Sequence, residues 1–318
     1  MTWNRALVTG GAGFIGSRLV DALMSRGYEI VALDNLSAGK LESIEQWFGN
    51  TRFTFLKGDL LDLDTIEKTL EGCDVVFHLA ANPDVRIGAN DTKIDYEQNV
   101  LATYRLLEAM KNSKSCKNIV FTSSSTIYGD AKTIPTPEDY GPLRPISLYG
   151  ASKLASEALI SGYSHLFNFR GILCRLANIV GPNSTHGVIY DFIRNLRRNR
   201  KTLQILGDGT QNKSYLYVDD CVEAILTVAE RAQDQVEIFN VGSDDMIDVL
   251  AIAEIVADEM DLKEVKMLLT REISDGRGWK GDVRRMLLDI SKINKLGWKP
   301  KWNSHQAVRL TVKGMLHG

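Results

Sequence analysis

The 318-residue sequence is poor in cysteine and proline and has no excess of charge of either sign. It contains four cysteines and seven prolines, and its 38 lysines and arginines are balanced by 40 aspartates and glutamates. The formal net charge is therefore −2. This balance excludes a strongly basic nucleic-acid-binding protein and leaves no polyanionic tail. We expect no nucleic-acid partner.

Long apolar runs are also missing. None approaches the ~20 residues that a membrane-spanning helix needs, and the initial MTWNR leads into a strand-like ALVT with no room for the core of a signal peptide. We therefore predict a cytoplasmic protein with no membrane partner. The cysteines, Cys73, Cys116, Cys174 and Cys221, lie far apart and form no CxxC or Cys/His cluster. Because isolated cysteines behave mostly as small hydrophobic residues, we expect buried reduced thiols, with no disulfide framework and no metal site.

The first half of the sequence alternates short apolar runs with longer helical patterns. The runs interpreted as strands lie near Ala6, Val31, Phe55, Phe77, Val120 and Leu173. This alternation is typical of a parallel sheet covered by helices on both faces, so we predict an α/β fold with a doubly wound parallel sheet. We assign residues 1–176 to this first domain, to which a strand near residues 236–242 is expected to return. Residues 177–318 would form a smaller α/β lobe, in which residues 203–218 read as two short strands around a turn.

A glycine cluster lies between the first predicted strand and the helix after it, in TGGAGFIGSRLV. Gly11, Gly13 and Gly16 spell GxGxxG, and Gly10, Gly13 and Gly16 spell GxxGxxG. Such glycines permit a tight turn, a close approach of the backbone to a pyrophosphate and the packing of helix against strand, while the helix N-terminus faces the phosphates. An ordinary loop is the alternative, but the strand and helix on either side favour a dinucleotide site of the Rossmann type.

Asp34 ends the second predicted strand, 18 residues after Gly16. That distance is close to the ~20 residues expected for the acid that binds the ribose hydroxyls of a dinucleotide. Its charge would repel a 2′-phosphate, and no arginine follows at Asn35 or Leu36. We therefore predict NAD rather than NADP as the cofactor; the alternative role for Asp34 is a turn or helix cap.

Tyr149 and Lys153 lie in LYGASKLASEAL, where helix-favouring residues and the i, i+4 spacing place both side chains on one helix face. A tyrosine that acts as a base near neutral pH needs its pKa lowered by ~3 units, and a nearby ammonium shifts it in that direction. A second match, Tyr128 to Lys132, runs through YGDAK, where glycine and aspartate favour a turn. Ser124 is the further candidate, at the carboxyl end of a strand where ligands bind in such sheets, although serine runs also simply end strands.

Together these residues resemble the extended short-chain dehydrogenase/reductase family, in its nucleotide-sugar epimerase and dehydratase branch. The ordered motifs that carry the resemblance span nearly the whole chain: TGGAGFIGS, DNLS, GDL, HLAA, SSSTIYG, YGASK, RLANIVGP, GVIYDFI, LGDGTQNKSYLYVDD and DISKINKLGWKP. The resemblance implies Tyr149 as the catalytic base. It implies Lys153 as the partner that lowers the pKa of Tyr149 and holds the nicotinamide ribose, and Ser124 as a hydrogen-bonding aid at the sugar hydroxyl.

The resemblance also implies two sets of binding residues. The NAD-binding set is Gly10, Gly13, Phe14, Ile15, Gly16, Asp34, Asn35, Ser37, Gly39, Asp59, Leu60, Leu79, Ala80, Ala81, Asn99, Ser123, Tyr149 and Lys153. The substrate-binding set is Ser124, Ser125, Tyr149, Asn178, Val188, Phe192, Lys213, Tyr215, Arg277 and Lys280. Lys213 stands where many relatives have arginine, and either Arg277 or Lys280 would supply a second cation for a diphosphate. A homodimer is implied too, through helices around residues 101–110 and 154–166, whose apolar residues could equally cover the sheet.

The member of the branch is indicated by what SSSTIYG lacks. Dehydrating members resemble STDEVYG, with an Asp/Glu pair where this chain has Ser125 and Thr126, and decarboxylating members resemble a form with glutamate in place of Ser125. Neither hydroxyl titrates near pH 7, so elimination lacks its acid and base. We expect a 4-epimerase of UDP-glucose and UDP-galactose. Three alternatives remain open: a UDP-uronate epimerase, for which Arg86 is the early candidate cation; a UDP-N-acetylhexosamine epimerase, with Met286 near the sugar; and a non-catalytic dinucleotide-sensing module.

Overall fold

The computed structural model describes residues 3–270, 273 and 275–317, and it divides into two compact units. Unit 1 contains the chain up to residue 124 together with residues 148–175 and 225–239, and unit 2 contains residues 125–147, 176–224 and the chain from residue 240 on. The chain crosses between the units near residue 176, where the second lobe is predicted to begin, and also at other points. Each unit is therefore assembled from three separate stretches.

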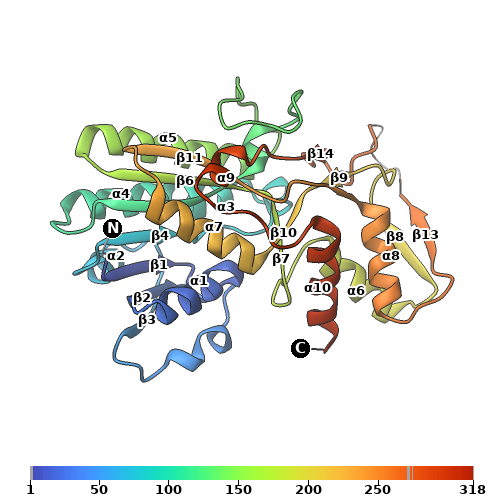
Figure 1. Ribbon diagram of the computed structural model, residues 1–318, viewed down its shortest axis with the longest axis horizontal. Helices are drawn as coiled ribbons and strands as arrows, with labels where there is room; N and C mark the ends of the chain where they lie inside the picture. The colour runs from blue at the N-terminus through green and yellow to red at the C-terminus, as the bar shows by residue number, and fades with distance from the viewer. Residues whose placement is uncertain (1–2, 271–272, 274, 318) are drawn as a thin grey trace. The chain divides into compact units, whose positions relative to one another are not determined.

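Unit 1 is built on a sheet that has seven strands within the described residues, in the order β11-β6-β5-β4-β1-β2-β3 (Figure 1). The strands are β1 Arg5–Thr9, β2 Glu29–Asp34, β3 Phe53–Lys57, β4 Val75–His78, β5 Asn118–Ser124, β6 Arg170–Leu176 and β11 Val236–Val241. The pairs from β3 through to β5 are parallel. Because the order of the strands reverses between β1 and β4, this is a doubly wound sheet of the Rossmann type, and the predicted fold class is confirmed.

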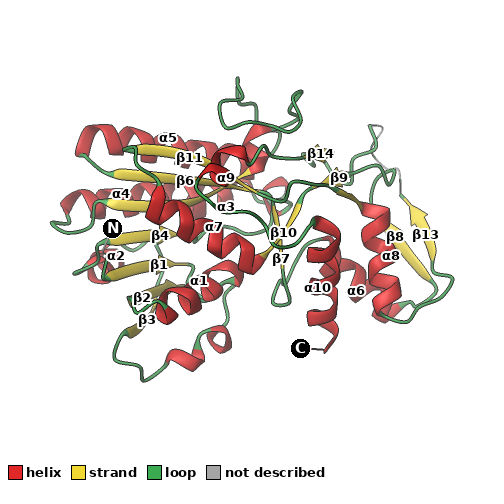
Figure 2. Cartoon of the chain, in the orientation of Figure 1, coloured by secondary structure: helices red, strands yellow, loops and turns green. Residues whose placement is uncertain are grey.

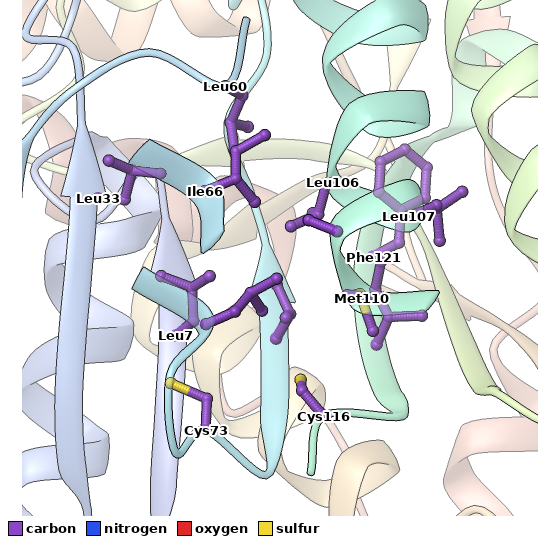
Figure 3. Packing of buried hydrophobic residues seen from close by; sticks show 14 of the residues in the cluster. Leu7, Leu33, Leu60, Ile66, Cys73, Leu106, Leu107, Met110, Cys116 and Phe121 are labelled. Carbon is purple, nitrogen blue, oxygen red and sulfur yellow. The ribbon is translucent and has the colours of Figure 1, made fainter. Parts of the chain in front are cut away.

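Helices lie on both faces of this sheet (Figure 1). The helices of unit 1 are α1 Phe14–Ser25, α2 Leu63–Leu70, α3 Thr92–Asp95, α4 Ala102–Asn112 and α5 Leu148–Phe167, and α7 Val218–Arg231 begins in unit 2 and ends in unit 1. Shorter turns lie at η1 Leu41–Ser43, η2 Glu45–Trp47, η3 Ile87–Ala89 and η4 Tyr96–Leu101. Leu106 of α4 and Ile66 of α2 pack with Leu7 of β1 and Phe121 of β5 in one apolar core (Figure 3). Each such side chain contributes ~1.5–3 kcal/mol to stability by its burial.

The four cysteines are buried and free, as expected from their isolation in the sequence. Cys73 and Cys116 belong to the same core and precede β4 and β5 (Figure 3). Burial raises the pKa of Cys73 to about 11 and those of Cys116 and Cys174 to about 12. These three side chains are therefore protonated thiols near neutral pH and serve as small apolar core residues.

Unit 2 combines helices with short strands (Figure 2). Its elements are η5 Ser125–Tyr128, β7 Asn178–Val180, α6 Val188–Arg198, β8 Thr202–Ile205, β9 Asn212–Lys213, β10 Tyr215–Tyr217, β12 Ile247–Asp248, α8 Val249–Glu259, β13 Lys266–Leu269, β14 Arg285–Met286, α9 Ser291–Lys295 and α10 Ser304–His317. Residues of α6, β8, α8 and α10 pack into a second apolar core.

The prediction of two short strands around a turn over residues 203–218 is wrong. The segment contains three short strands, and each pairs with a strand from elsewhere in the chain: β8 with β13, β9 with β12 and β14, and β10 with β7. Such distant pairing leaves no local hairpin pattern in the sequence. Across the part of the chain that the structure describes, no helix is both long and apolar enough to span a bilayer.

Candidate active site

The glycine-rich loop connects β1 to α1 at the carboxyl edge of the sheet. Gly10 has a φ of +69°, and a Cβ built on it would lie 2.9 Å from the backbone nitrogen of Ala80, while one built on Gly16 would overlap the carbonyl oxygen of Gly10. Side chains are therefore excluded at both positions. Gly13 precedes α1, and within the described residues no side chain caps this helix. Its first-turn N–H groups, at Phe14 and Ile15 among others, fit the pyrophosphate of a dinucleotide.

The acid at the end of β2 is held by the loops around it. The carboxylate of Asp34, 8% exposed, accepts hydrogen bonds from the backbone nitrogens of Ala12 at 3.0 Å and Leu36 at 2.8 Å. Asp34 therefore stabilises the glycine-rich loop, and its remaining lone pairs leave room for the predicted bonds to a ribose. At the end of β3, Asp59 accepts a hydrogen bond from Asn35 Nδ2 at 2.8 Å.

The remaining residues of the predicted cofactor set lie near these strand ends. Gly39 lies against Asp34: a Cβ built there would be 2.8 Å from the Asp34 carboxylate oxygens. Ser37 donates its backbone N–H to Asn35 Oδ1. Leu60 is buried after β3, and Leu79, Ala80 and Ala81 directly follow β4.

A buried polar row crosses the sheet beneath these loops. The His78 ring hydrogen-bonds to Thr9 Oγ1 at 2.8 Å and to Thr103 Oγ1 at 3.0 Å. Thr9 Oγ1 also accepts hydrogen bonds from the backbone nitrogens of Leu79 and Ala80, so it fixes the chain where it leaves β4. Burial, helped by the charge of Lys153, lowers the pKa of His78 to about 3. His78 is therefore a neutral core residue.

The three predicted catalytic side chains meet at the carboxyl end of β5. A side-chain hydrogen bond joins Tyr149 and Ser124. Lys153, one helical turn after Tyr149 in α5, is 3% exposed and donates a hydrogen bond from Nζ to the carbonyl oxygen of Thr122 at 2.9 Å. Its Nζ lies 5.8 Å from the centre of the Tyr149 ring. Ser123 is buried, and no described group hydrogen-bonds to its hydroxyl oxygen.

The pKa of Tyr149 differs from the expectation based on its spacing from Lys153, which is a lowered value. Burial and the negative charge of Asp95 raise the pKa of Tyr149 to about 12, against a lowering by the hydrogen bond with Ser124. Burial lowers the pKa of Lys153 to about 8, while Asp95 and Glu157 act to raise it. In the chain by itself Tyr149 is therefore a phenol, and the ammonium alone does not bring its pKa toward neutrality.

The second Tyr-x-x-x-Lys match lies in unit 2 and is not on a helix face. Tyr128 is 3% exposed in the short turn η5, and its hydroxyl donates to Asn240 Oδ1 at 2.7 Å. The next residue, Gly129, has a φ of +60°, and Lys132 is exposed in the loop beyond it. The turn predicted for this segment is confirmed, and Tyr128 is a structural residue.

Sequence reasoning missed the polar residues that surround Asn99. This asparagine is 2% exposed in η4, a π-helical turn; its Nδ2 donates to Ser152 Oγ at 2.8 Å and its Oδ1 accepts from the backbone nitrogen of Asn82 at 2.8 Å. Asp95 is 1% exposed and accepts a hydrogen bond from Asn82 Nδ2 at 2.9 Å. The available signal was the i, i+4 spacing of Asp95 and Asn99, which places both on one helix face.

In unit 2, two of the three candidate diphosphate-binding cations are paired with carboxylates. Lys213 Nζ donates to Asp282 Oδ1 at 2.5 Å, and Arg277 donates to Asp130 Oδ2 at 2.7 Å and to the carbonyl oxygen of Asp282 at 2.6 Å. Lys213 and Arg277 thus share Asp282, whereas Lys280 is exposed. Of the two alternatives for the second cation, this arrangement favours Arg277.

The other predicted substrate residues of unit 2 fall into two groups. Asn178 and Tyr215 are opposite each other on the paired strands β7 and β10, and burial raises the pKa of Tyr215. Val188 begins α6 and is partly exposed, whereas Phe192, 5% exposed, packs into the core of unit 2. Phe192 is therefore mainly a core residue. Ser125, 7% exposed, begins η5.

Unit 2 also contains polar atoms that the sequence did not single out. The buried atoms Gln211 Oε1, Asn212 Oδ1 and Trp279 Nε1 have no hydrogen-bond partner among the described residues. The Trp279 ring lies under Lys213, with Nζ 5.3 Å from its centre. Since buried polar atoms in proteins are normally bonded, these three are candidates to contact a polar ligand.

Comparison with known proteins shows the family of the chain. Residues 6–242 match the model of the NAD dependent epimerase/dehydratase family. A UDP-glucose 4-epimerase of Mycolicibacterium smegmatis is 33% identical, with 97% of each chain covered. A solved UDP-galactose 4-epimerase is 43% identical with a TM-score of 0.86, covering 98% of each chain. The UDP-glucuronic acid 4-epimerase of Bacillus cereus is 29% identical with a TM-score of 0.88, covering 98% of this chain and 99% of that one. The chain belongs to the NAD-dependent epimerase/dehydratase family of enzymes, and its cofactor is NAD.

Proposed function

We propose that the protein is a UDP-glucose/UDP-galactose 4-epimerase, which inverts C4 of the sugar through a transient 4-keto intermediate. The observation that carries the proposal is the meeting of Tyr149, Ser124 and Lys153 in unit 1. A second support is the pair of hydroxyl side chains at Ser125 and Thr126. At these positions dehydrating members resemble a form with an Asp/Glu pair, and decarboxylating members resemble a form with glutamate in place of Ser125. The apparatus suffices for removing and returning one hydride and one proton.

In this mechanism Tyr149 takes the proton of the C4 hydroxyl while Ser124 hydrogen-bonds to the same oxygen. NAD, when bound, would supply a reversible hydride acceptor, its positively charged nicotinamide ring. The pKa of the Tyr149 phenol is about 12 in the chain alone. For Tyr149 to act as a base near pH 7 this pKa must fall by about 5 units, which corresponds to a free energy of about 7 kcal/mol. Lys153, held by Thr122, is placed to stabilise the phenolate. Return of the hydride to the opposite face of the 4-keto sugar would invert C4.

The nucleotide part of the substrate would be bound by unit 2. Lys213 and Arg277 supply positive charge for a diphosphate, and the ligand's phosphates would replace Asp282 and Asp130 as their partners. Trp279 Nε1 offers a donor, and Gln211 Oε1 and Asn212 Oδ1 offer acceptors, for ribose or base. Binding energy from this remote part holds the intermediate while the sugar turns.

The two alternative substrates are a UDP-uronate and a UDP-N-acetylhexosamine, and different residues bear on each. A uronate would need a cation for its carboxylate, but the Arg86 guanidinium already donates to both oxygens of Asp84, at 3.0 Å each. That pairing does not separate a uronate from a neutral hexose, because a carboxylate would displace Asp84 just as the phosphates would displace Asp130 from Arg277. For an N-acetylated sugar, Met286 of β14 is opposite Lys213 in register, and its flexible thioether accommodates either substituent. A dinucleotide-sensing module without activity would have no need of the complete Tyr149, Lys153 and Ser124 set.

The test is to incubate the purified protein with UDP-galactose, with and without added NAD, and to follow UDP-glucose by NMR. Conversion supports the proposal. In Tyr149→Phe, which removes one oxygen, turnover should fall at least ~100-fold while NAD still binds. A protein that binds NAD yet converts only UDP-uronates or UDP-N-acetylhexosamines would contradict the hexose assignment. Failure to convert any of these sugars would favour the sensing module.

We also infer a homodimer formed through α4 and α5. Leu107 is fully buried and Leu159 packs against the same core, so these two cover the sheet. Tyr104 of α4 and Leu166 of α5 are instead 43% and 77% exposed. These exposed apolar side chains fit burial against a second copy of the same helices. Sedimentation that finds only monomer at micromolar concentration would contradict the dimer.

A further inference from the structure

Asp95 is a buried carboxylate that the proposed mechanism does not use. It ends α3, is 1% exposed, and accepts hydrogen bonds at Oδ1 from Asn82 Nδ2 at 2.9 Å and from Asn99 Nδ2 at 3.4 Å. Its other oxygen, Oδ2, is buried and has no hydrogen-bond partner among the described residues. Burying a polar oxygen without a partner opposes folding, so packing alone gives no reason for a carboxylate at this place.

A short chain of hydrogen bonds connects Asp95 with the first turn of α5. Asn99, which donates to Asp95, also donates from Nδ2 to Ser152 Oγ at 2.8 Å. Ser152 Oγ in turn donates to the carbonyl oxygen of Tyr149 at 2.8 Å. The carboxylate is thus linked through two side chains to the backbone of the proposed base.

The free oxygen of Asp95 also lies close to the start of α5. A Cβ built on Gly88 of η3 would overlap Asp95 Oδ2 and would lie 3.5 Å from Leu148 Cβ. Leu148 immediately precedes Tyr149. The glycine therefore leaves the space in which the Asp95 carboxylate approaches this helix, and a larger residue at Gly88 would displace it.

The charges around Asp95 act on one another through a water-poor interior. Among the described residues, the charged or titratable groups that interact with Asp95 or with its partners are Asp91 before α3, Asp84 and its ion-pair partner Arg86 before η3, Tyr149, Lys153 and Glu157 on α5, Arg175 on β6 and His78 on β4. The charge of Asp95 acts to raise the pKa of both Tyr149 and Lys153. Burial raises the pKa of Asp95 itself, while the hydrogen bond from Asn82 and the charge of Lys153 act to lower it. Glu157 forms an ion pair with Arg175 at 2.8 Å and His78 is neutral, and of the two carboxylates that act on Lys153 the charge of Asp95 has the larger effect.

We propose that Asp95 is a positioning residue that sets the pH range in which Tyr149 serves as a base, by keeping Lys153 an ammonium and opposing ionisation of the phenol. An anion beside a phenol disfavours the phenolate, and the same anion beside an amine favours its charged form. The inference rests on the proposed function in taking Tyr149 as the base. It adds a residue whose charge opposes ionisation of this base.

The first experiment compares the pH dependence of kcat/KM in the parent protein, Asp95→Asn and Asp91→Asn. Asparagine is isosteric: its oxygen can keep the bond from Asn82, while its amide group occupies the place of Oδ2. With the anion gone, the acid limb of the profile should shift to lower pH by about one unit. The control Asp91→Asn removes an exposed carboxylate four residues away and keeps a capping side chain on α3, so its limb should stay close to that of the parent.

A profile of Asp95→Asn that overlays that of the parent, in protein with an unchanged unfolding curve, overturns the proposal. Asp95→Ala removes the same charge with a smaller side chain and must shift the limb in the same direction. An equal shift in Asp91→Asn also overturns it, because the effect would then be general to acidic residues nearby.

A second readout needs no substrate. Tyrosinate absorbance is titrated in Asp95→Asn and in the same variant carrying Tyr149→Phe, and the difference isolates Tyr149. The phenol should ionise at lower pH than in the parent treated in the same way, and an unchanged titration overturns the proposal. If the protein converts no UDP-sugar at all, the proposed function fails while this titration still decides the role of Asp95.

Discussion

Single buried side chains at the sheet's carboxyl edge are held in one protonation state by their surroundings. His78 shows this most clearly, because it is 1% exposed and the hydroxyls of Thr9 and Thr103 bond both of its ring nitrogens. Its pKa of about 3 in the folded chain is below the ~6.5 of an unfolded histidine. Neutral His78 therefore fits the fold, whereas charged His78 does not.

This difference predicts acid sensitivity. Above pH 6.5 the imidazole is neutral in both the folded and the unfolded chain and contributes nothing to the pH dependence. Below pH 6.5 the imidazole binds a proton in the unfolded chain but stays neutral in the folded chain. Stability should therefore fall by ~1.4 kcal/mol per pH unit from this group as the pH drops from 6.5 toward 3. In His78→Gln that part of the slope should disappear, as measured by urea unfolding at several pH values between 4 and 7. Equal slopes in the two proteins would show that His78 titrates in the folded state.

At the scale of elements, α5 is anchored to β6 by a buried ion pair. Arg175 of β6 donates to both carboxylate oxygens of Glu157 of α5, at 2.8 Å from Nη2 to Oε2, and the two side chains are 4% and 5% exposed. Glu157 is one helical turn after Lys153, so the pair also fixes the part of α5 that carries the ammonium.

Breaking this pair on one side should be costly. In Glu157→Gln the Arg175 charge stays buried without its carboxylate, and we expect a loss of about 3 kcal/mol in the free energy of unfolding. The matched control is Glu230→Gln, which breaks the exposed pair of Arg26 and Glu230 and should cost less than about 1 kcal/mol. Urea unfolding measures both, and similar losses in the two variants would mean that burial does not strengthen the pair.

The sequence predicts some elements of the fold and of the site better than others. The buried strands of unit 1 are predicted well, because a strand covered on both faces reads as a continuous apolar run. The glycine-rich loop and the Tyr149–Lys153 spacing are likewise local patterns. Short strands such as β9 depend on distant partners, and the role of Asp95 depends on Asn82, which lies 13 residues earlier. Such contacts are set by tertiary packing, and a polar residue in sequence is otherwise read as exposed.

For the whole molecule, the residues predicted for the cofactor and those predicted for the nucleotide part of the substrate fall in different units. Gly10, Gly16, Asp34 and Lys153 belong to unit 1, whereas Lys213 and Arg277 belong to unit 2. Because each unit has an apolar core of its own, a surface substitution in one should leave the binding residues of the other folded. Binding of the two ligands should therefore be separable by mutation.

The separation can be tested with one variant from each unit. Lys213→Ala removes a cation whose carboxylate partner is 2% exposed, so KM for the UDP-sugar should rise at least ~10-fold while the Kd for NAD stays unchanged. Asp34→Asn removes the charge predicted to repel a 2′-phosphate but keeps an acceptor for the predicted ribose bond and for the N–H of Ala12. The ratio of NADP to NAD affinity should rise, with KM for the sugar unchanged at saturating NAD. Calorimetry with each cofactor and steady-state kinetics measure the four quantities. If each variant weakened the binding of both ligands equally, the cofactor residues and the nucleotide residues would form one coupled site. The assignment of cofactor and nucleotide binding to separate units would then be wrong.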